Sequence, residues 1–415
     1  METVDLVVVG AGAAGLMAGI QAGRAHRGAR IVVLDSARKI GAKILVSGGG
    51  RCNVTHDQVD ETSFWGSSRP AIRKVLRRFD VPHTIEFFRE LGVPLKTEET
   101  GKLFPVTDRA RTVLDALLAA ARAAGVDLRH PCRAESLRRE DGAFVIAGPP
   151  TGAGVWGPLR AARVILATGG MSLPKSGSDG RGYELARGLG HSVTPRIFPG
   201  LVPLTLERGS FPLSLSGLSA LATLEVRSAT GRSIISFTGA VLCTHFGLSG
   251  PAVLDISRHY LQARHADPGA ALVANWLPGE SAESIDAMLR GLGARGPGRA
   301  LRERMPERLA RALCLAAGVD PSEPGHGLTR EKRRALAERI GGMVLPVTGT
   351  RGFDVAEVTA GGVPLDELRL DTMASRVCPG LSLCGEICDV DGRIGGYNFQ
   401  WAWASGHVAG LSAIA

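Results

Sequence analysis

The hydrophobic and polar positions near the N-terminus follow the order strand, tight turn, helix and strand. Asp5–Val9 holds a short apolar run, the segment GAGAAG at Gly10–Gly15 follows, and a stretch rich in Ala, Leu and Met continues through Ala25. A second apolar run, Arg30–Asp35, ends in an acid. Short β-forming runs on both sides of a glycine turn and a helical stretch predict a βαβ unit.

The spacing of the glycines in this unit has a physical meaning. Gly10 permits the tight turn, Gly12 lets backbone N–H groups approach a pyrophosphate, and Gly15 lets the helix pack on the strand. The positive end of the helix dipole faces the phosphates. Asp35 can accept hydrogen bonds from an adenosine ribose. The complete pattern predicts a dinucleotide site for FAD, and a glycine turn without a ligand is the alternative.

Helical and strand patterns continue after this unit. Residues 69–91 are predicted to form one helix with a basic side, which is either a solvated face or an anion-binding surface. A second helix is expected over residues 110–124, and antiparallel hairpins over residues 138–158. Ala162–Thr168 is a further buried strand that runs into Gly169–Gly170.

The middle of the chain interrupts this α/β pattern. From about residue 194 short alternating runs with Pro and Gly suggest a β-rich insert, and residues 279–340 are predicted to be helical. The C-terminal part returns to strands and glycine turns and closes with an apolar helix after Gly396. We therefore expect an α/β protein with a discontinuous Rossmann-like FAD-binding domain of residues 1–193 and 343–415, a β-rich insert domain of residues 194–278 and a small helical domain of residues 279–342.

A second glycine-rich run, SGGGRCN at Ser47–Asn53, follows Lys43. A flexible linker could have three glycines, but this run is too short to link domains and is flanked by Lys, Arg, Cys and Asn. A loop that lays its backbone along a flat ring system has this composition. We therefore predict that the run contacts the flavin.

Composition narrows the class of protein without deciding its substrate. The chain has 415 residues, of which 44% are hydrophobic and 21% charged, which is typical of a globular protein with two or three domains. The formal net charge of +9 favours an anionic partner. Leu6–Ile20 resembles a signal-peptide core, but the residues before it are acidic and glycines interrupt it. Neither a secretory signal nor a transmembrane helix is expected.

The seven cysteines are odd in number and include no CxxC pair. This pattern favours reduced thiols and a cytoplasmic protein. Cys378, Cys384 and Cys388 lie close in sequence, but their spacing matches no standard zinc site. We therefore expect no metal.

Motifs along the whole chain resemble one known family. They are GAGAAG at Gly10–Gly15, SGGGRCN at Ser47–Asn53, ATGG at Ala167–Gly170, THFGLSGP at Thr244–Pro251, TAGGV at Thr359–Val363 and GEICDVDGRIGGYNFQWAWASG at Gly385–Gly406. In this order they resemble the BaiN/RdsA-type FAD-dependent oxidoreductases, formerly called aminoacetone oxidase-like flavoproteins. The resemblance implies a glutathione-reductase-type FAD domain interrupted by a β-barrel-like domain, which itself carries a small helical domain.

The resemblance also implies roles for individual residues. Gly385–Glu386 would meet the ribityl chain, with Glu where Asp is usual, and the helix that begins near Gly395–Asn398 would direct N–H groups at the flavin. Cys52, Arg51 and His245 are the polar catalytic candidates near the ring, although Cys52 also fits a buried structural thiol and His245 a structural histidine. The residues expected to bind FAD are Gly10, Gly12, Ala13, Ala14, Gly15, Asp35, Lys43, Ser47, Gly49, Gly50, Arg51, Cys52, Asn53, Arg133, Ala167, Thr168, Gly169, Gly170, Gly385, Glu386, Gly395, Gly396, Tyr397 and Asn398.

The family resemblance implies reduction of a polarised C=C bond, either in a steroid-like enone or in a uracil of ribosomal RNA. The basic charge and the Arg-rich helical segments around Arg73–Arg78 and Arg299–Arg311 favour RNA. The expected reaction then converts uracil to dihydrouridine, with hydride from reduced flavin to C6 and a proton to C5. The alternatives are a reductase of a small-molecule enone, a small-amine oxidase and a non-catalytic flavin-binding redox sensor.

The source of hydride is also constrained by the sequence. A separate NAD(P)H domain usually carries a second glycine fingerprint after a strand, but Gly188–Gly190 lacks both the strand and the third glycine. We therefore expect NAD(P)H to visit the flavin as a transient hydride donor.

Overall fold

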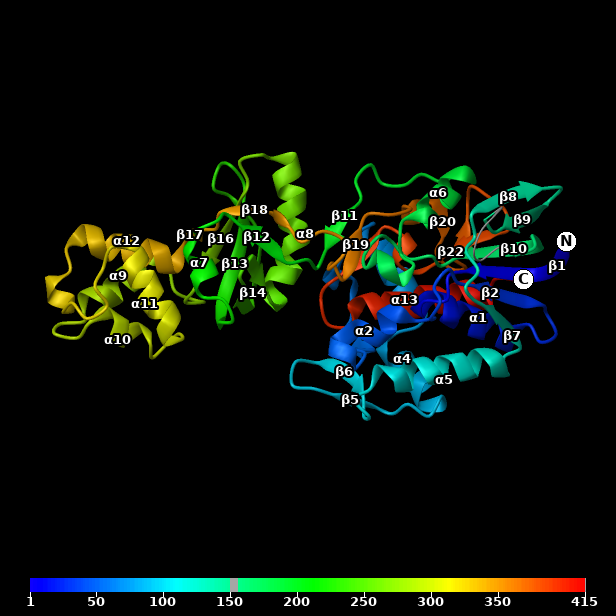
Figure 1. Ribbon diagram of the computed structural model, residues 1–415, viewed down its shortest axis with the longest axis horizontal. Helices are drawn as coiled ribbons and strands as arrows, with labels where there is room; N and C mark the ends of the chain where they lie inside the picture. Colours follow the sequence, from blue (N-terminus) through cyan, green and yellow to red (C-terminus); the bar gives the residue numbers. More distant parts are fainter. Residues whose placement is uncertain (150–155, 415) are drawn as a thin grey trace. The chain divides into compact units, whose positions relative to one another are not determined.

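The computed structural model describes residues 1–149 and 156–414, and Figure 1 labels their elements. The chain forms two compact units, the first made of Met1–Pro199 with Glu357–Ala415 and the second of Gly200–Ala356. The chain thus leaves the first unit after residue 199 and returns to it at residue 357, whereas the sequence placed these boundaries at 193 and 343.

A nine-stranded sheet forms the centre of the first unit. Its main order is β20-β21-β22-β10-β1-β2-β7, and β8 and β9 attach to it through β10. β1 pairs in parallel with both β2 and β10, which confirms the predicted βαβ unit. The strands are β1 (Glu2–Val9), β2 (Ile31–Leu34), β7 (Val126–Arg129), β8 (Ser136–Glu140), β9 (Ala143–Ala147), β10 (Leu159–Leu166), β20 (Leu368–Arg369), β21 (Ala374–Ser375) and β22 (Leu381–Leu383).

Two helices from opposite ends of the chain pack together beside this sheet. They are α1 (Ala13–Ala25) and α13 (Tyr397–Leu411), drawn in blue and red in Figure 1. A Cβ atom on Gly406 would lie 2.5 Å from the carbonyl oxygen of Ala14, so glycine is needed there for the two backbones to approach. The C-terminal helix is thereby held against the glycine turn of the first βαβ unit.

The basic segment of residues 69–91 forms two helices and not the single helix that its pattern suggested. α3 (Arg69–Leu76) and α4 (Val81–Glu90) are separated because Asp80 caps the second helix, accepting a hydrogen bond from the backbone N–H of His83 at 3.1 Å. Pro82 at the start of α4 reinforces the break because it cannot donate within a continuous helix. The helix predicted over residues 110–124 is present as α5 (Ala110–Ala123).

The remaining elements of the first unit surround the sheet. Within the predicted hairpin region, β8 and β9 pair antiparallel, and residues 150–155 lie outside the described part of the chain. The other elements are α2 (Ala42–Gly50), β3 (Thr55–His56), β4 (Phe64–Gly66), β5 (Leu95–Thr97), β6 (Lys102–Pro105), α6 (Arg181–Gly188), β11 (Phe198–Gly200), β19 (Val358–Ala360) and β23 (Val390–Gly392), with short 3-10 turns at Glu61–Ser63, Pro174–Ser176, Leu365–Glu367 and Gly385–Ile387.

The second unit is built on a seven-stranded sheet in the order β17-β16-β13-β14-β15-β12-β18. Among the described residues no strand pair joins β17 to β18, so this sheet is open rather than a closed barrel. Its strands are β12 (Leu204–Leu206), β13 (Ser219–Arg227), β14 (Ser233–Cys243), β15 (Gly247–Ser249), β16 (Ala271–Asn275), β17 (Met343–Val344) and β18 (Val347–Thr350). Its helices are α7 (Phe211–Ser214), α8 (Pro251–Ala266), α9 (Ala282–Arg290), α10 (Pro297–Leu301), α11 (Glu307–Ala316) and α12 (Arg330–Gly341).

One hydrophobic core joins the β-rich and the helical parts of this unit. It includes Val226 and Leu272 from the sheet and Leu309 and Leu336 from the helices. Residues 343–350 belong to the same unit because β17 pairs with β16, and β18 with β12. The helix α8 lies inside the region expected to be β-rich, and its polar residues buried in the fold obscure the periodicity that would have predicted it.

Candidate dinucleotide-binding site

The glycine turn between β1 and α1 has the geometry that its spacing predicts. Gly10 has a φ of +105° and donates its N–H to the carbonyl oxygen of Leu34 at 2.7 Å. A Cβ atom on Gly10 would overlap Ala167, and one on Gly15 would overlap Gly10. A Cβ atom on Gly12 would meet no protein atom within 4 Å. Open space therefore lies directly at the positive end of α1, where a pyrophosphate would bind.

The acid at the end of β2 is tied to this turn. The Asp35 carboxylate accepts hydrogen bonds from the backbone N–H of Ala11 at 2.7 Å and of Ala37 at 2.8 Å. Burial raises the pKa of Asp35, although these two backbone hydrogen bonds oppose the rise. Each carboxylate oxygen has a second lone pair, so Asp35 can also accept a ribose hydroxyl. Arg133 directly follows Cys132, whose N–H donates to the carbonyl oxygen of Asp35 at 2.6 Å.

The triglycine run forms a left-handed turn at the end of α2. Gly48, Gly49 and Gly50 have φ values of +56°, +68° and +86°, a region that residues with a side chain rarely adopt. The turn is exposed, and the buried side-chain oxygen of Asn53 beside it has no hydrogen-bond partner in the described part of the chain. Buried polar atoms are almost always paired, so this oxygen fits a group supplied by a ligand. The Ser47 hydroxyl donates to the carbonyl oxygen of Ile44 at 2.9 Å.

Lys43 and Glu386, which are distant in sequence, form an ion pair of 2.8 Å in this region. Ser172 joins them, because its hydroxyl oxygen lies 2.9 Å from the Lys43 ammonium and 2.8 Å from the Glu386 carboxylate. The backbone N–H of Thr359 donates to the same carboxylate at 2.9 Å. Burial raises the pKa of Glu386, but the Lys43 charge and the hydrogen bonds outweigh it and hold the pKa below its usual value.

Glycine contacts bring this cluster to the dinucleotide turn. A Cβ atom on Gly385 would lie 2.7 Å from the Cβ of Ala14 in the first turn of α1. A Cβ atom on Gly170 would overlap the Thr359 side chain and lie 3.0 Å from the Glu386 carboxylate. The fold thus brings Lys43, Gly170, Gly385 and Glu386 together beside the first turn of α1. Sequence reasoning missed Ser172 and Thr359, although TAGGV and ATGG had marked their neighbourhoods.

The C-terminal motif begins α13 as expected, but its Tyr397 and Asn398 side chains contact other residues of the protein. Gly396 caps the helix, and a Cβ atom there would lie 2.5 Å from the carbonyl carbon of Thr55. Asn398 exchanges hydrogen bonds with the backbone of Gly392, accepting at 2.8 Å and donating at 3.0 Å. Tyr397 stacks on His56 with ring centroids 4.9 Å apart. The backbone N–H groups of the first turn, rather than the Asn398 amide, are the groups this segment can offer a ligand.

The three catalytic candidates have different surroundings. Cys52 has 0% exposure, and burial raises the pKa of its thiol to about 12. With no accessible surface, Cys52 has the burial expected of the structural thiol that was the alternative interpretation. His245 is an exposed residue of the second unit, between β14 and β15, and the first unit forms its cluster without it.

Arg51 is held by its neighbours within the first unit. Its guanidinium donates to Glu98 at 2.6 Å, lies 3.7 Å from Asp108 and stacks 4.0 Å above the Phe104 ring centroid. Arg133 is likewise paired with Glu135 and Asp179, at 2.5 Å each. Both arginines are therefore oriented by carboxylates, and neither has a side chain in the Lys43 cluster.

The motifs and the fold agree with a known family. The chain matches the family described as the HI0933-like protein Rossmann domain over residues 4–412. This protein belongs to that family. A 3-dehydro-bile acid delta(4,6)-reductase of Clostridium scindens is 34% identical, and the match covers 98% of each chain. A ribosomal RNA dihydrouridine synthase of Escherichia coli is also 34% identical, over 100% of this chain and 99% of that protein.

Solved structures share the fold of this family member at low sequence identity. Quinol fumarate reductase of E. coli has a TM-score of 0.53 at 18% identity, covering 100% of this chain and 70% of that one. A 3-ketosteroid-delta4-(5alpha)-dehydrogenase of Rhodococcus jostii has a TM-score of 0.50 at 16% identity, covering 100% and 97%. The family membership predicted from the motifs is confirmed. The first unit is a Rossmann-type FAD-binding domain, and the protein is an FAD-dependent oxidoreductase.

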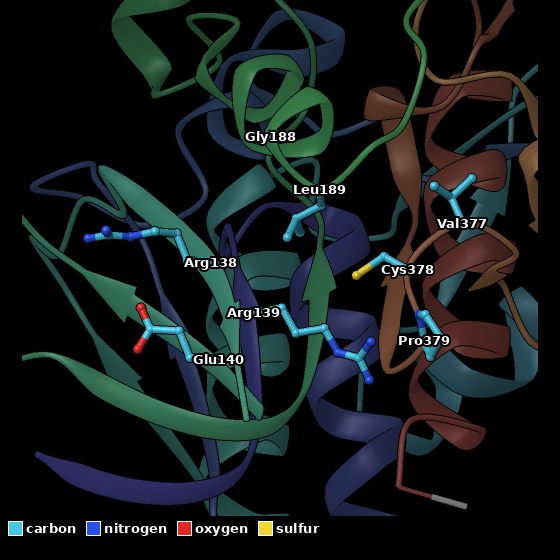
Figure 2. A pocket seen from close by; sticks show the side chains of 8 residues that line it. All are labelled: Arg138, Arg139, Glu140, Gly188, Leu189, Val377, Cys378 and Pro379. Atoms are coloured by element: carbon cyan, nitrogen blue, oxygen red, sulfur yellow. The ribbon is translucent and has the colours of Figure 1, made fainter. Parts of the chain in front are cut away.

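Two further features of this oxidoreductase lie away from the cluster. The segment Gly188–Gly190 ends α6 and does not follow a strand, so it does not form a second dinucleotide turn. Figure 2 shows a surface pocket of about 440 Å³ that contains none of the residues predicted to bind FAD. It is lined by Arg138, Arg139, Glu140, Gly188, Leu189, Val377, Cys378 and Pro379.

The described part of the chain also bears on membrane crossing and metal binding. Its helices are all too short or too polar to cross a bilayer. The described residues include no group of three or more His, Cys, Asp or Glu side chains that could hold a metal ion.

Proposed function

We propose that this protein reduces a polarised C=C bond and that its substrate is a uracil of ribosomal RNA, which becomes dihydrouridine. Both curated relatives carry names that describe saturation of a C=C bond conjugated to a carbonyl. NAD(P)H is the proposed transient hydride donor, because only one dinucleotide turn was found in the sequence. A cytoplasmic location follows from this substrate and from the cysteine pattern.

The arginines of residues 290–311 are the observation that carries the RNA proposal. This segment contains seven arginines and two glutamates. Three of the arginines are paired with carboxylates, in the pairs Arg290–Asp286, Arg295–Glu303 and Arg304–Glu280. The other four are exposed and form no ion pair with any described residue, namely Arg299, Arg302, Arg308 and Arg311. Exposed guanidinium groups without carboxylate partners are available to phosphates.

The second basic segment, Arg73–Arg78, offers fewer unpaired cationic side chains than its sequence suggested. Arg73 is paired with Glu61, and this hydrogen bond is the main reason that the pKa of Glu61 falls to about 2. Lys74, Arg77 and Arg78 are exposed and have no ion-pair partner among the described residues. We propose that these three residues, rather than Arg73, contact RNA phosphates.

The residues gathered in the first unit define the proposed chemistry. The chemistry that bound FAD supplies is hydride transfer to the β-carbon of the conjugated system. The α1 terminus, Asp35 and the Lys43–Glu386 pair would hold the dinucleotide, and the triglycine turn would exclude water from one face. Arg51 is the proposed donor to the substrate carbonyl.

The substrate can be tested directly. We expect the purified protein with NAD(P)H to form dihydrouridine in protein-free ribosomal RNA from a strain that lacks the gene, measured by mass spectrometry of nucleosides. Reduction of a small cyclic enone is the second candidate, favoured by the similarity to the bile acid reductase. Rapid enone reduction without any dihydrouridine would exclude the RNA proposal and leave C=C reduction intact.

A further inference from the structure

One strand of the small sheet β3-β6-β5 joins the triglycine turn to the beginning of α13. Lys102 and Phe104 lie on the same face of this strand, β6, because side chains alternate along a strand. A Cβ atom on Gly48 in the triglycine turn would lie 2.9 Å from the Phe104 ring. A Cβ atom on Gly395, just before α13, would lie 3.4 Å from the Cε atom of Lys102. The face of β6 that carries Lys102 therefore adjoins both segments.

This face of the sheet is basic. His56 of β3 is paired with Lys102, and Lys96 of β5 is paired with Phe104, so these four side chains share one face. The Arg51 guanidinium stacks 4.0 Å from the Phe104 ring centroid. Four basic side chains thus lie between the triglycine turn and the start of α13, and any of them could in principle act on a ligand there.

Ion pairs occupy two of these four side chains. Lys96 donates to the carboxylate of Asp108, and Arg51 donates to that of Glu98 at 2.6 Å. The Lys102 ammonium forms neither a hydrogen bond nor an ion pair with any described residue. Because Lys102 is also partly exposed, its three N–H donors are available to a ligand.

The other titratable side chains beside Lys102 are held by neighbours. His56 has its Nε2 atom 3.0 Å from the carbonyl oxygen of Thr100 and its Nδ1 atom 2.8 Å from the Asp57 carboxylate. Tyr397 is buried and stacks on the His56 ring. Lys102 is therefore the side chain of this group that is both reachable and unpaired among the described residues.

Reduction of a C=C bond conjugated to a carbonyl needs a proton as well as a hydride. The Arg51 guanidinium can donate a hydrogen bond to the carbonyl, but arginine stays protonated in proteins and does not supply the proton. Cys52 has no accessible surface. A lysine ammonium can donate a hydrogen bond and can also give up its proton, and lysine is among the side chains that serve in general acid–base catalysis.

We infer that Lys102 is the catalytic acid of the proposed reduction and transfers a proton from Nζ to the α-carbon of the substrate. Hydride supplied by reduced FAD forms a C–H bond at the β-carbon. The electron pair of the former C=C bond forms the second C–H bond with the Lys102 proton, and the neutral amine then takes a proton from water. The inference rests on the proposed C=C reduction and applies equally to a uracil and to an enone.

The test follows reoxidation of the flavin in a single turnover. Holoprotein is reduced with dithionite, without NAD(P)H, and mixed anaerobically with cyclohexenone or with protein-free ribosomal RNA from a strain that lacks the gene. Lys102→Ala should retain FAD and the wild-type unfolding temperature but reoxidise about 100-fold or more slowly. The substrate concentration at half saturation should stay within about twofold of wild type, because the proton is transferred only in the chemical step.

Two comparisons separate proton transfer from the effect of charge. Lys102→Arg keeps a positive charge but does not release a proton, so it should be as slow as Lys102→Ala. Methylamine in solution should accelerate Lys102→Ala in proportion to its concentration, because a small amine can replace the missing donor. A purely structural role of Lys102 would not produce this rescue.

Lys39→Ala is the matched control, because Lys39 is an exposed lysine of the same unit and lies on the loop after β2. It should reoxidise as wild type does, with or without methylamine. A wild-type rate in Lys102→Ala or Lys102→Arg would overturn the inference, as would a slow Lys102→Ala that methylamine does not accelerate. The cyclohexenone reaction involves no RNA, so failure of the RNA proposal cannot produce any of these results.

Discussion

A Cβ atom on Gly15 would overlap the carbonyl oxygen of Gly10, whereas one on Gly12 would meet no protein atom within 4 Å. Glycines three residues apart in one turn are therefore needed for different reasons. Gly15 permits α1 to pack on the end of β1. Gly12 keeps clear a space that the protein itself does not fill.

This difference predicts separate effects on folding and on cofactor binding. Gly12 has a φ of −77°, which valine adopts without strain. Gly12→Val should therefore lose FAD, while its apoprotein unfolds at the same temperature as wild-type apoprotein. Gly15→Ala is the contrasting variant and should unfold at a lower temperature. Visible flavin absorbance and thermal unfolding measure the two effects. Stoichiometric FAD in Gly12→Val would contradict the assignment of the turn.

Replacing Asp35 should weaken the binding of FAD and leave the binding of FMN unchanged. Asp35→Ala removes the acceptor proposed for the ribose, so affinity for FAD should fall about tenfold or more, while the weak affinity for FMN should not change. The same variant loses the acceptor for the N–H groups of Ala11 and Ala37. Asp35→Asn, which keeps one acceptor oxygen, should show a smaller loss. Calorimetric titration of the apoprotein with both flavins provides the measurement.

Cys52 should be needed for stability more than for turnover. Cys52→Ala removes a fully buried side chain and should lower the free energy of unfolding by about 1 kcal/mol. NAD(P)H-dependent reduction should remain within about twofold of wild type, because a structural thiol makes no transition-state interaction that its removal would abolish. Cys243→Ala, at a buried thiol of the second unit, is the control. A large loss of turnover with FAD still bound would restore Cys52 as a catalytic candidate.

His407 should make the first unit sensitive to acid. It lies on α13 with its ring 4.5 Å from that of Phe79, and burial, with a smaller contribution from His83, lowers its pKa to about 4. An unfolded histidine has a pKa near 6.5, so its contribution to stability is complete above pH about 6.5 and is lost as the pH falls toward 4. The full loss is about 3 kcal/mol.

Urea unfolding at pH 7 and pH 4.5 tests this expectation. His407→Leu should lose less stability between the two pH values than wild type, whereas a variant of the exposed His265, His265→Gln, should behave as wild type does. An identical pH dependence of His407→Leu and wild type would show that this side chain is not buried as a neutral group.

The unpaired arginines should determine how RNA binding depends on salt. Log affinity falls as log salt rises, and each phosphate contact that is removed makes this slope less steep by roughly 0.7 to 0.9. Replacing Arg299, Arg302, Arg308 and Arg311 with Ala should therefore make the slope less steep by about 3, while bound FAD is retained. Arg208→Ala with Arg232→Ala, at exposed positions elsewhere in the second unit, is the control. An unchanged slope in the fourfold variant would assign these arginines to solvated surface.

The βαβ unit was predictable because its signal is local. The strands, the glycine turn and Asp35 lie within about one supersecondary element, and Gly15 is required by the carbonyl oxygen of Gly10 in the same turn. The break between α3 and α4 was also encoded locally, in Asp80 and Pro82, but the apolar periodicity on both sides concealed it. Periodicity reports a buried face and not the point at which a helix ends.

Tertiary structure alone decided which side chains meet. Lys43, Ser172 and Glu386 lie in separate parts of the chain, and only the parallel sheet, with Gly385 against Ala14, brings them into one cluster. The burial of Cys52 was equally invisible, because the same residue type serves as an acid when exposed and as core when enclosed. The sequence by itself determined the cofactor fold, since backbone turns depend on residue type at fixed spacing. It did not determine the polar network, because hydrogen bonds between distant segments depend on where the whole chain places them.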